Sequence, residues 1–480
     1  MKPTWITETL SLIGQSVELS GWVDNVRDHG KVFFLDLRDR SGIIQCVITQ
    51  AHQNFETAKT IRPESVIRLR GTIQARPEKL INPNLATGTI ELAIEEITIL
   101  ALAETPPIPL NTDGYEINEE TRLHYRYLDL RRQRLQQNLI QRAKVTHFIR
   151  SWLSQRNFIE IETPILTKST PGGARDYLVP SRQQPGNFYA LPQSPQQYKQ
   201  LLMVAGMEYY FQITRCFRDE DPRGDRQPEF TQLDLELSFV DQEDILALTE
   251  DIFLTLVRTL YPQKKLTLTA DGRIPRMTYR EAMEKYQSDK PDVRQNRDDP
   301  DELAFLFVVD FPAFEWKEAD PSASSGQGKG RWDAVHHPFT APQVKDVDDF
   351  WQKFKSAPAE MLAQQYDFVC NGYEIGGGSI RIHDPKLLAA VFQAMGHSAE
   401  AVQEKFGHLL EAFTYGVPPH GGIAPGLDRL MMVLQNEPNI REVIAFPKTS
   451  EGRDPMMGAP SEVDPQQLRD LGLKIEKNDE

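Results

Sequence analysis

The segment FRDEDPRGDRQPEFTQLDLELSF, residues 217–239, alternates apolar and polar residues near both ends and carries dense charge in its centre. That alternation is the period of a half-buried strand, and the PRGDRQP between the two runs is rich in turn-forming residues. We therefore predict a strand–loop–strand hairpin. Arg218 beside acids, with Arg226 after the loop, would supply the rigid cations that phosphoryl or nucleotidyl transfer needs. On charge alone, a solvated hairpin of surface ion pairs, each contributing under about 1 kcal/mol, is the simpler interpretation.

Length and composition indicate a multidomain chain without membrane segments. The sequence has 480 residues and a formal net charge of −15, and single cores rarely grow past about 250 to 300 residues. It contains no apolar run of the roughly 18 residues that a bilayer span needs. The N-terminus lacks the features of a secretion signal or transit peptide, so we expect a cytoplasmic protein. Three widely spaced cysteines support neither a disulfide framework nor a zinc site.

Residues 1–103 show three β-rich runs, a short helical run and two more β-rich runs, broken by Gly and Asn/Pro turns. This is the order of a five-stranded OB-fold β-barrel, which commonly binds single-stranded nucleic acid. Trp22, Phe33 and Phe34 are candidate stacking faces, although a place in the barrel core is about equally expected for each ring. Cations near them are Arg27, Lys31, Arg76 and Lys79.

A second domain is expected over residues 135–480, after a linker over residues 104–134. The start of that linker is rich in Pro, Asn and acidic residues and has little apolar periodicity. From about Gln133 the apolar spacing predicts a long helix, followed by a β-run ending at Thr163 and Pro164. The irregular order of the later strands and helices favours an α+β fold, with an antiparallel sheet flanked by helices.

Two glycine-rich segments strengthen the catalytic interpretation of the hairpin. GYEIGGGSIRI, residues 372–382, places an acid, three glycines and an arginine on one strand, and glycines within a strand often mark the close approach of a ligand. HGGIAPGLDRLMMVL, residues 420–434, is predicted to pass from a glycine-rich turn into an amphipathic helix with Arg429 in its first turns. A helix N-terminus of this kind suits a nucleotide phosphate.

Together these segments resemble the class II aminoacyl-tRNA synthetases, and most closely the bacterial-type aspartyl-tRNA synthetases. Motif 1 would be the helix from about residue 135 with FIEIETPIL, which has Pro164 at the family's homodimer interface. Motif 2 would be the hairpin, and motif 3 would be GIAPGLDRL. Other family-like runs are RYLDLRR, ARDYLVPSR, ALPQSPQQYKQLL, HHPFT and GYEIGGGSIRIH.

The resemblance implies ATP-dependent ligation of L-aspartate to the 3′ end of tRNA(Asp) through an aspartyl-adenylate, without a protein nucleophile. Positioning and charge neutralisation would carry the catalysis. Arg218, Arg429 and Glu374 would be catalytic, and Glu374 and Asp367 would hold Mg²⁺. The residues implied for ATP binding are Arg218, Glu220, Arg226, Gln227, Phe230, Glu374 and Arg429.

Selection of aspartate would require cations for its side-chain carboxylate, and the family's pair corresponds to Lys199 and Arg381. Arginine supplies a bidentate fork and lysine a point charge. The residues implied for aspartate binding are Ser194, Gln196, Lys199, Arg218, Asp234, His336, His337 and Arg381.

In the barrel, the resemblance implies an anticodon-binding set of Arg27, His29, Phe34, Gln45, Arg76 and Lys79. His29, in RDHG, resembles members that charge both tRNA(Asp) and tRNA(Asn), whereas Lys79 lies where those members often have a small residue. His29 slightly favours relaxed charging, which would imply a tRNA-dependent amidotransferase as a cellular partner.

The sequence departs from the family pattern at two places. The large insertion between motifs 2 and 3 is largely absent near residues 295–303, and we expect a surface deletion that leaves the catalytic sheet intact. Gly172 replaces a glutamate that helps to hold the substrate ammonium, so we expect weaker aspartate binding and a looser loop.

Two alternatives remain open. An asparaginyl-tRNA synthetase is the nearest rival, although Lys199 argues against a neutral substrate side chain. A catalytically inactive tRNA-binding paralogue would fit Gly172 and the missing insertion, but not the joint presence of Arg218, Glu374, Arg381 and Arg429. Aspartate-dependent pyrophosphate exchange separates the enzyme from such a paralogue.

Overall fold

The computed structural model describes residues 4–169, 174–318 and 330–476. The chain divides into two compact units, residues 1–136 and 137–480. Each unit has its own hydrophobic core. Within the described residues, no helix is both long and apolar enough to cross a bilayer.

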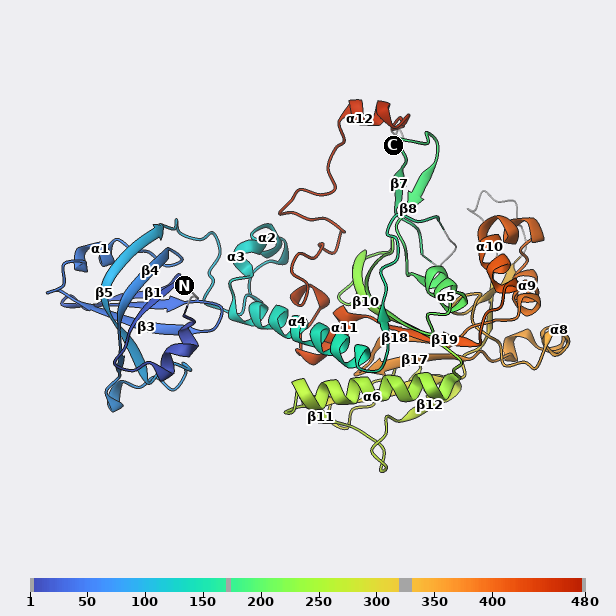
Figure 1. Cartoon of the computed structure of the whole chain (residues 1–480), viewed down its shortest axis with the longest axis horizontal. Helices are drawn as coiled ribbons and strands as arrows, with labels where there is room; N and C mark the ends of the chain where they lie inside the picture. The colour runs from blue at the N-terminus through green and yellow to red at the C-terminus, as the bar shows by residue number, and fades with distance from the viewer. Residues whose placement is uncertain (1–3, 170–173, 319–329, 477–480) are drawn as a thin grey trace. The chain divides into compact units, whose positions relative to one another are not determined.

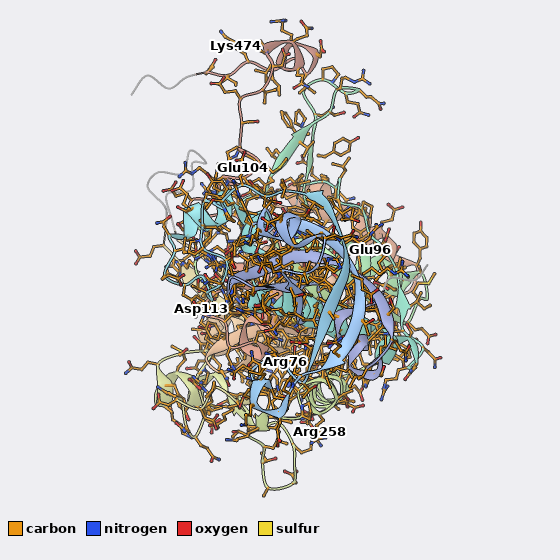
Figure 2. The ribbon with its side chains drawn as sticks, turned by 90° about the vertical axis from the view of Figure 1, so that its left-hand side faces the viewer. Arg76, Glu96, Glu104, Asp113, Arg258 and Lys474 are labelled. Atoms are coloured by element: carbon orange, nitrogen blue, oxygen red, sulfur yellow. The ribbon has the colours of Figure 1, made fainter. Side chains whose placement is uncertain are left out.

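The first unit contains a closed five-stranded barrel in the order β1-β2-β3-β5-β4, so the predicted OB-fold barrel is confirmed (Figure 1). Phe33 lies in the barrel core, whereas Phe34 is half-buried and Trp22 is exposed. In Figure 2, Arg76 marks the residue that follows the end of β4, and Glu96 marks a position on β5. The elements are η1 Ile6–Ser11, β1 Ser16–Asp28, β2 Val32–Arg38, β3 Ile43–Thr49, α1 Phe55–Lys59, β4 Val66–Ala75, η2 Glu78–Leu80 and β5 Ile90–Ala101.

The segment predicted as a linker, residues 104–134, is not wholly irregular. It contains α2 Glu119–His124 and α3 Arg126–Asp129. Asp129 is buried and forms ion pairs with Arg122, Arg126 and Arg132. Three cations around one carboxylate give this short segment a polar core, which apolar periodicity does not reveal.

The second unit is built on an eight-stranded sheet in the order β12-β14-β17-β18-β19-β10-β9-β6. Its six central strands are antiparallel, as expected, but both edge strands, β12 and β6, pair in parallel. The sheet is therefore mixed. Its strands are β6 Ile159–Glu160, β9 Tyr209–Phe217, β10 Glu229–Ser238, β12 Arg276–Thr278, β14 Phe305–Val309, β17 Gln365–Cys370, β18 Tyr373–Ile380 and β19 His420–Pro425.

Helices and short ladders surround this sheet. The helices are α4 Gln133–Ser154, α5 Gln196–Val204, α6 Gln242–Leu260, α7 Tyr279–Tyr286, α8 Val347–Ser356, α9 Pro385–Ala394, α10 Ala399–Thr414, α11 Leu427–Leu434 and α12 Pro465–Asp470, with 3₁₀ turns η3 Pro358–Glu360 and η4 Ile440–Glu442. The two-stranded pairs are β7 Leu178–Pro180 with β8 Phe188–Ala190, β11 Lys265–Leu266 with β13 Glu302–Leu303, and β15 Phe314–Lys317 with β16 Arg331–Ala334.

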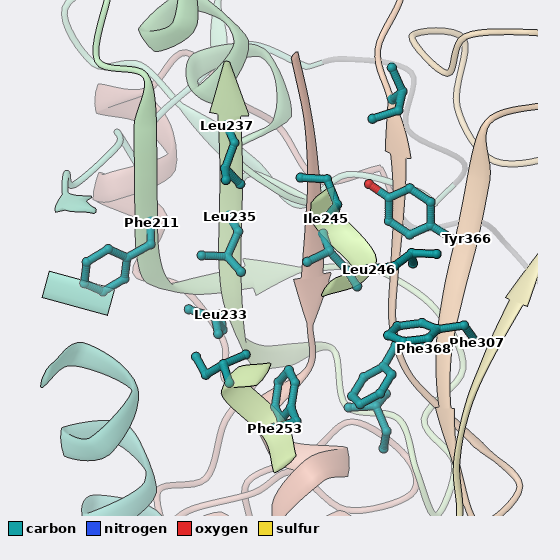
Figure 3. Close-up of a cluster of buried hydrophobic side chains, with 14 of the residues drawn as sticks. Phe211, Leu233, Leu235, Leu237, Ile245, Leu246, Phe253, Phe307, Tyr366 and Phe368 are labelled. Carbon is teal, nitrogen blue, oxygen red and sulfur yellow. The ribbon is translucent and has the colours of Figure 1, made fainter. Parts of the chain in front are cut away.

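Strand β10 divides its side chains between the core and the opposite face. Because successive side chains of a strand point to opposite faces, Leu233, Leu235 and Leu237 join the apolar cluster with residues of α6 (Figure 3). Asp234 and Glu236 face the other way. The same cluster includes Phe368, whose ring centroid is 4.9 Å from that of Phe253 and 5.0 Å from that of Phe305.

The sheet is intact near the expected deletion. After α7, a short loop leads to β13 and then to β14, which pairs with β12 and β17. Phe307 of β14 is fully buried and packs 5.3 Å from Phe368. The Glu302 carboxylate accepts hydrogen bonds from the backbone N–H groups of Gln295 and Asn296, which fixes the loop.

Candidate active site

A cavity of about 480 Å³ opens on the face of the sheet opposite α6. Its walls come from α5, the β9–β10 hairpin, the segment around His336 and His337, β18 and the start of α11. The predicted hairpin is confirmed, with β9 and β10 antiparallel. HGGIAP forms strand β19 rather than the expected turn. An added Cβ on Gly422 would lie 2.0 Å from the Leu235 carbonyl oxygen, so the glycine is what allows this strand to approach β10.

The floor of the cavity is a buried cluster of two cations and two acids. Lys199 Nζ lies 2.9 Å from Asp234 Oδ1 and 3.2 Å from Glu236 Oε2. Arg381 donates from Nε and Nη2 to the two oxygens of Glu236, at 2.9 and 3.1 Å. All four side chains are at most 2% exposed. The Glu236 carboxylate therefore pairs with both cations, Lys199 and Arg381.

The two carboxyl groups of this cluster differ in their pKa. Burial alone would raise the pKa of both. At Glu236 the nearby Arg381 and Lys199 outweigh burial and lower the pKa to about 2. At Asp234, burial raises the pKa, and the negative charge of Glu236 raises it further. These two effects outweigh the attraction of Lys199, which lowers the pKa.

Two groups of this cluster, and Arg218 in the same cavity, retain unused hydrogen-bonding capacity among the described residues. Asp234 Oδ2 and Arg218 Nε are buried and have no partner there. Lys199 uses two of its three donors, on Asp234 and Glu236. A buried polar atom without a partner is costly unless a ligand supplies one, so the cavity fits a ligand with both an ammonium and a carboxylate.

His336 and His337 stand beside this cluster, with ring centroids 4.4 Å apart. His337 Nε2 accepts a hydrogen bond from Arg381 Nη1 at 2.9 Å. The pKa of His337 is lowered well below 6.5 by burial, His336 and Arg381. His336 is exposed to solvent on one side. The surrounding protein and the charges of Arg381 and Arg218 nevertheless lower its pKa as well. Both rings are therefore neutral at pH 7.

The charged hairpin loop is organised by pairs within the site. The Arg218 guanidinium carbon lies 5.1 Å from the ring centroid of Phe230. Arg226 Nη2 lies 2.8 Å from Glu220 Oε2. These four side chains line the same cavity, so this part of the hairpin charge belongs to the site, whereas Asp221 and Arg223 are exposed to solvent.

Gln227, another residue predicted to bind ATP, forms side-chain hydrogen bonds with the C-terminal segment. Its side chain is buried, donates to the Lys448 carbonyl oxygen at 3.1 Å and accepts from the Lys448 backbone N–H at 2.7 Å. This amide therefore joins the hairpin loop to the C-terminal segment, and its side-chain hydrogen-bonding groups are already engaged.

Arg429 links the hairpin loop to β18. Its Nε donates to the Asp225 carbonyl oxygen at 3.1 Å, and its Nη1 donates to the Glu374 carbonyl oxygen at 2.9 Å. Its guanidinium also lies 3.2 Å from the Asp225 carboxylate and 3.6 Å from that of Glu374. The planar fork thus holds two chain segments at one end of the cavity.

Asp367 and Glu374 converge because β18 contains a bulge. Asp367 pairs with Gly377, but Val369, two residues later, pairs with Glu374, three residues earlier in β18. Strand β18 therefore contains one extra residue between these two pairs. Opposed residues share a face, and the bulge therefore turns Glu374 toward the side of Asp367. A Cβ on Gly377 would lie 3.1 Å from Asp367 Oδ1 and 3.7 Å from Glu374 Oε1.

Burial and the Glu374 charge raise the pKa of Asp367 well above its usual value. A divalent cation between the two acids would relieve that repulsion. Among the described residues no three His, Cys, Asp or Glu side chains form a metal-binding group. Two carboxylates completed by phosphate oxygens and water are nevertheless the usual ligands of Mg²⁺ at nucleotide sites.

The barrel carries a separate polar cluster on its own unit. Arg27 donates to both oxygens of Asp36, at 2.6 and 2.9 Å, and to Gln45 Oε1 at 3.0 Å. Gln45 in turn donates to Glu91 at 2.8 Å and accepts from Arg76 at 3.3 Å. The amide orientation of Gln45 is thereby fixed.

Two rings border this barrel cluster. Phe34 lies beneath Arg27, with 5.8 Å between its ring centroid and the guanidinium carbon. The ring of His29, which is exposed, meets Phe34 edge-on at 5.6 Å. Lys79 is exposed on η2 and has no contact with these side chains among the described residues. The barrel thus brings together five of its six predicted residues.

Sequence reasoning missed several residues of these clusters. Glu236 is detectable, because it follows Asp234 by two positions on a strand and must share its face. Asp428 accepts from the Thr231 backbone N–H at 2.8 Å and pairs with Arg142 at 2.6 Å, contacts that no local pattern reveals. Ser194 and Gln196 line the cavity as expected, whereas Gly172 lies outside the described residues.

Family models match both units of the chain. A model of class II tRNA synthetases (D, K and N) matches residues 118–450. A model of the OB-fold nucleic acid binding domain matches residues 17–100.

Curated relatives cover almost the entire chain. An aspartate–tRNA(Asp/Asn) ligase from Dehalococcoides mccartyi is 41% identical and is aligned over 98% of each protein. An aspartate–tRNA ligase from Staphylococcus aureus is 39% identical over 97% of this chain and 98% of the relative. The first alignment runs over 603 positions against 480 residues here, so that relative contains segments that this chain lacks.

Solved structures with the same fold have low sequence identity. The asparaginyl-tRNA synthetase from Pyrococcus horikoshii complexed with asparaginyl-adenylate has a TM-score of 0.72 and 24% identity, covering 94% of this chain and 98% of that one. An aspartyl-tRNA synthetase from Entamoeba histolytica has a TM-score of 0.70 and 23% identity, covering 93% and 91%. These likenesses establish the fold.

Because Glu236 is buried beside two cations, we predict that the stability lost on replacing it depends on pH. At pH 7, Glu236→Gln should lower the free energy of unfolding by about 3 to 5 kcal/mol, because it leaves the buried Arg381 without its acid and Lys199 with Asp234 alone. The folded pKa is below the unfolded one, so the stabilisation is complete above about pH 4.5 and is lost as the pH falls toward 2. The difference from wild type should therefore narrow over that range.

Urea denaturation from pH 3 to pH 7, followed by tryptophan fluorescence, measures this difference. Glu243→Gln, which changes an exposed acid paired with Arg276, is the control and should change stability by less than about 1 kcal/mol. A deficit of Glu236→Gln that stays constant over the whole pH range would contradict the lowered pKa.

Proposed function

The chain belongs to the class II aminoacyl-tRNA synthetases of the aspartate, lysine and asparagine group, and from this premise we propose that it is an aspartate–tRNA ligase. The observation that carries the proposal is the polarity of the cavity floor, where Lys199 and Arg381 lie beside Asp234 Oδ2, which has no partner in the described part of the chain. The two cations suit a side-chain carboxylate. Asp234 Oδ2, with Ser194 and Gln196 nearby, suits the α-ammonium group.

The reaction has two steps. The aspartate α-carboxylate attacks the α-phosphorus of ATP and pyrophosphate leaves, giving aspartyl-adenylate. The 3′-hydroxyl of the terminal tRNA ribose then attacks the activated carbonyl and AMP leaves. No protein nucleophile is needed, because orientation of the reactants and neutralisation of their charge lower the barrier.

We assign the nucleotide to the end of the cavity between Phe230 and Arg429. Phe230 would stack on the adenine, and Glu220 would contact its edge. Arg218, whose Nε has no partner among the residues that the structure describes, would bind the α-phosphate and the substrate carboxylate. Arg429, already held against Glu374 and Asp225, would cover the other face of the ring and reach the γ-phosphate.

Gln227 and Arg226 support this site from the hairpin loop. Arg226 pairs with Glu220 and so orients the acid toward the adenine. Because the NH₂ group and the oxygen of the Gln227 side chain are both hydrogen-bonded to the Lys448 backbone, we assign its effect on ATP binding to the position of the loop.

Asp367 and Glu374 would hold Mg²⁺ with the phosphates of ATP. When bound there, the ion would neutralise phosphate charge. The fit rests on two converging carboxylates and on the raised pKa of Asp367, since oxygen ligands are those that Mg²⁺ prefers.

The anticodon would bind to the barrel cluster around Arg27, Phe34 and Gln45. Single-stranded bases are read by stacking on aromatic rings and by hydrogen bonds to their edges. Arg76 and His29 border that surface. The exposed apolar side chains Ile159, Ile165 and Leu166, from the motif 1 region, support the family's homodimer for this chain.

An asparagine-specific enzyme is the competing candidate, favoured by the likeness to the asparaginyl-adenylate complex. A neutral amide substrate would leave the charge of Lys199 and Arg381 less well neutralised than a carboxylate does. The arrangement of charges therefore favours aspartate.

Pyrophosphate exchange with ATP tests the amino-acid specificity. Exchange should depend on aspartate and not on asparagine. Arg381→Leu should lower kcat/KM for aspartate by about thirtyfold to several thousandfold, because truncating one partner of a buried charge pair costs about 2 to 5 kcal/mol. Arg273→Leu, which removes a half-exposed arginine outside the cavity, is the matched control. Equal or better exchange with asparagine would reject the aspartate assignment.

The metal assignment predicts a shifted Mg²⁺ requirement. Glu374→Gln should raise the Mg²⁺ concentration for half-maximal exchange severalfold, because it removes a charged oxygen ligand. Glu411→Gln on α10, outside the cavity, should leave that concentration unchanged. An unaltered Mg²⁺ dependence of the Glu374→Gln variant would exclude this carboxylate as a ligand.

We further propose that the enzyme charges both tRNA(Asp) and tRNA(Asn), and that a tRNA-dependent amidotransferase then converts the second product. The resemblance of RDHG, with His29, to members that charge both tRNAs supports this, as does the 41% identity to an aspartate–tRNA(Asp/Asn) ligase. Wild-type enzyme should charge each purified transcript with labelled aspartate at similar efficiency.

His29→Leu should reduce charging of tRNA(Asn) about fivefold relative to tRNA(Asp), the effect of one lost hydrogen bond. Gln45→Leu should weaken both reactions and serves as the comparison. Charging of tRNA(Asp) alone by the wild-type enzyme would refute the relaxed specificity and the need for an amidotransferase.

A further inference from the structure

A chain of three buried or half-buried side chains runs from the start of β19 into the cavity. His420 Nδ1 lies 2.8 Å from the Pro418 carbonyl oxygen, and His420 Nε2 lies 3.1 Å from Gln200 Nε2. Gln196 Nε2 donates to Gln200 Oε1 at 3.2 Å. His420 and Gln200 are fully buried, whereas Gln196 reaches the cavity wall.

The chemistry of these groups fixes the direction of every hydrogen bond in the chain. A carbonyl oxygen only accepts, so His420 Nδ1 must carry the proton that is donated to Pro418. Burial lowers the pKa of His420, although Glu236 opposes this, and the ring is neutral at pH 7 with a lone pair on Nε2. Gln200 must therefore present its NH₂ group to His420 and its oxygen to Gln196.

The same logic determines the orientation of the Gln196 carboxamide. Gln196 must present its NH₂ group to the oxygen of Gln200, which leaves its own Oε1 toward the cavity. No described residue donates to that oxygen. The two orientations of a carboxamide have nearly the same shape, so packing alone would not select one of them.

We propose that His420 and Gln200 are positioning residues that hold the Gln196 oxygen toward the α-ammonium group of the substrate. This inference rests on the proposed function, in which that substrate is aspartate. In the reversed orientation the NH₂ group of Gln196 would face the ammonium, and an attractive hydrogen bond to a charged group would become a repulsive contact. In this relay from His420 through Gln200 to Gln196, the fixed proton position of the buried histidine determines the orientation of the Gln196 amide. That orientation favours binding of an ammonium group and so of an amino acid.

Gln200→Met tests the relay with little change in side-chain volume. In aspartate-dependent pyrophosphate exchange, it should raise KM for aspartate about tenfold, the effect expected for a hydrogen bond to a charged group, with KM for ATP nearly unchanged. His420→Leu removes the acceptor that fixes the Gln200 amide, and it should raise KM for aspartate in the same way.

A double-mutant cycle separates orientation from a general loss of structure. Glu at position 196 presents an oxygen in either orientation, so in the Gln196→Glu background Gln200→Met should raise KM for aspartate far less than in wild type. Gln435→Met is the matched control, because Gln435 donates to Tyr261 outside the cavity, and it should leave both KM values unchanged.

Three results would overturn the proposal. They are an unchanged KM for aspartate in Gln200→Met, an equal rise in both backgrounds, and an equal rise in KM for ATP. A wild-type enzyme without aspartate-dependent exchange would instead refute the proposed function itself. His420→Leu keeps the proposal testable if Gln200→Met fails to fold, because an unchanged KM for aspartate in that variant would also contradict the relay.

Discussion

The second unit depends on one buried carboxylate, Glu236, that joins Lys199 and Arg381 beneath the cavity. Two cations so close together would repel each other without it, and an unpaired buried charge is among the most costly features a protein can contain. The same acid leaves each cation with donors to spare. The cluster is therefore both a structural tie between α5, β10 and the end of β18 and a binding surface for a negatively charged group.

The glycines of β18 and β19 make this arrangement sterically possible. An added Cβ on Gly378 would lie 2.4 Å from the Gly422 carbonyl oxygen, and one on Gly422 would lie 2.2 Å from a carboxylate oxygen of Glu236. Side chains there would push the strands apart or displace Glu236. The glycine-rich runs thus serve mainly the close approach of strands and acids, and the bulge before Gly376 then directs Glu374 toward Asp367.

Much of the site was predictable because its residues lie in local patterns with a fixed period. The alternation of β10 placed Asp234 on a polar face, and the hairpin placed Arg218 and Phe230 across one turn. The same pattern implied Glu236, which went unnoticed. The engagement of Gln227 with Lys448, the relay through His420 and the role of Asp428 were not predictable, since each joins residues distant in sequence.

By itself, the sequence determined the order of the elements, the two folded units and the residue types available for the chemistry, because strand and helix periods and turn chemistry are local properties. The tertiary structure alone decided which cations share an acid, which face Glu374 occupies, and which way the Gln196 amide points. Those outcomes depend on strand register and on hydrogen bonds between distant segments, where one residue of shift or one amide rotation reverses the interaction without changing a letter of the sequence.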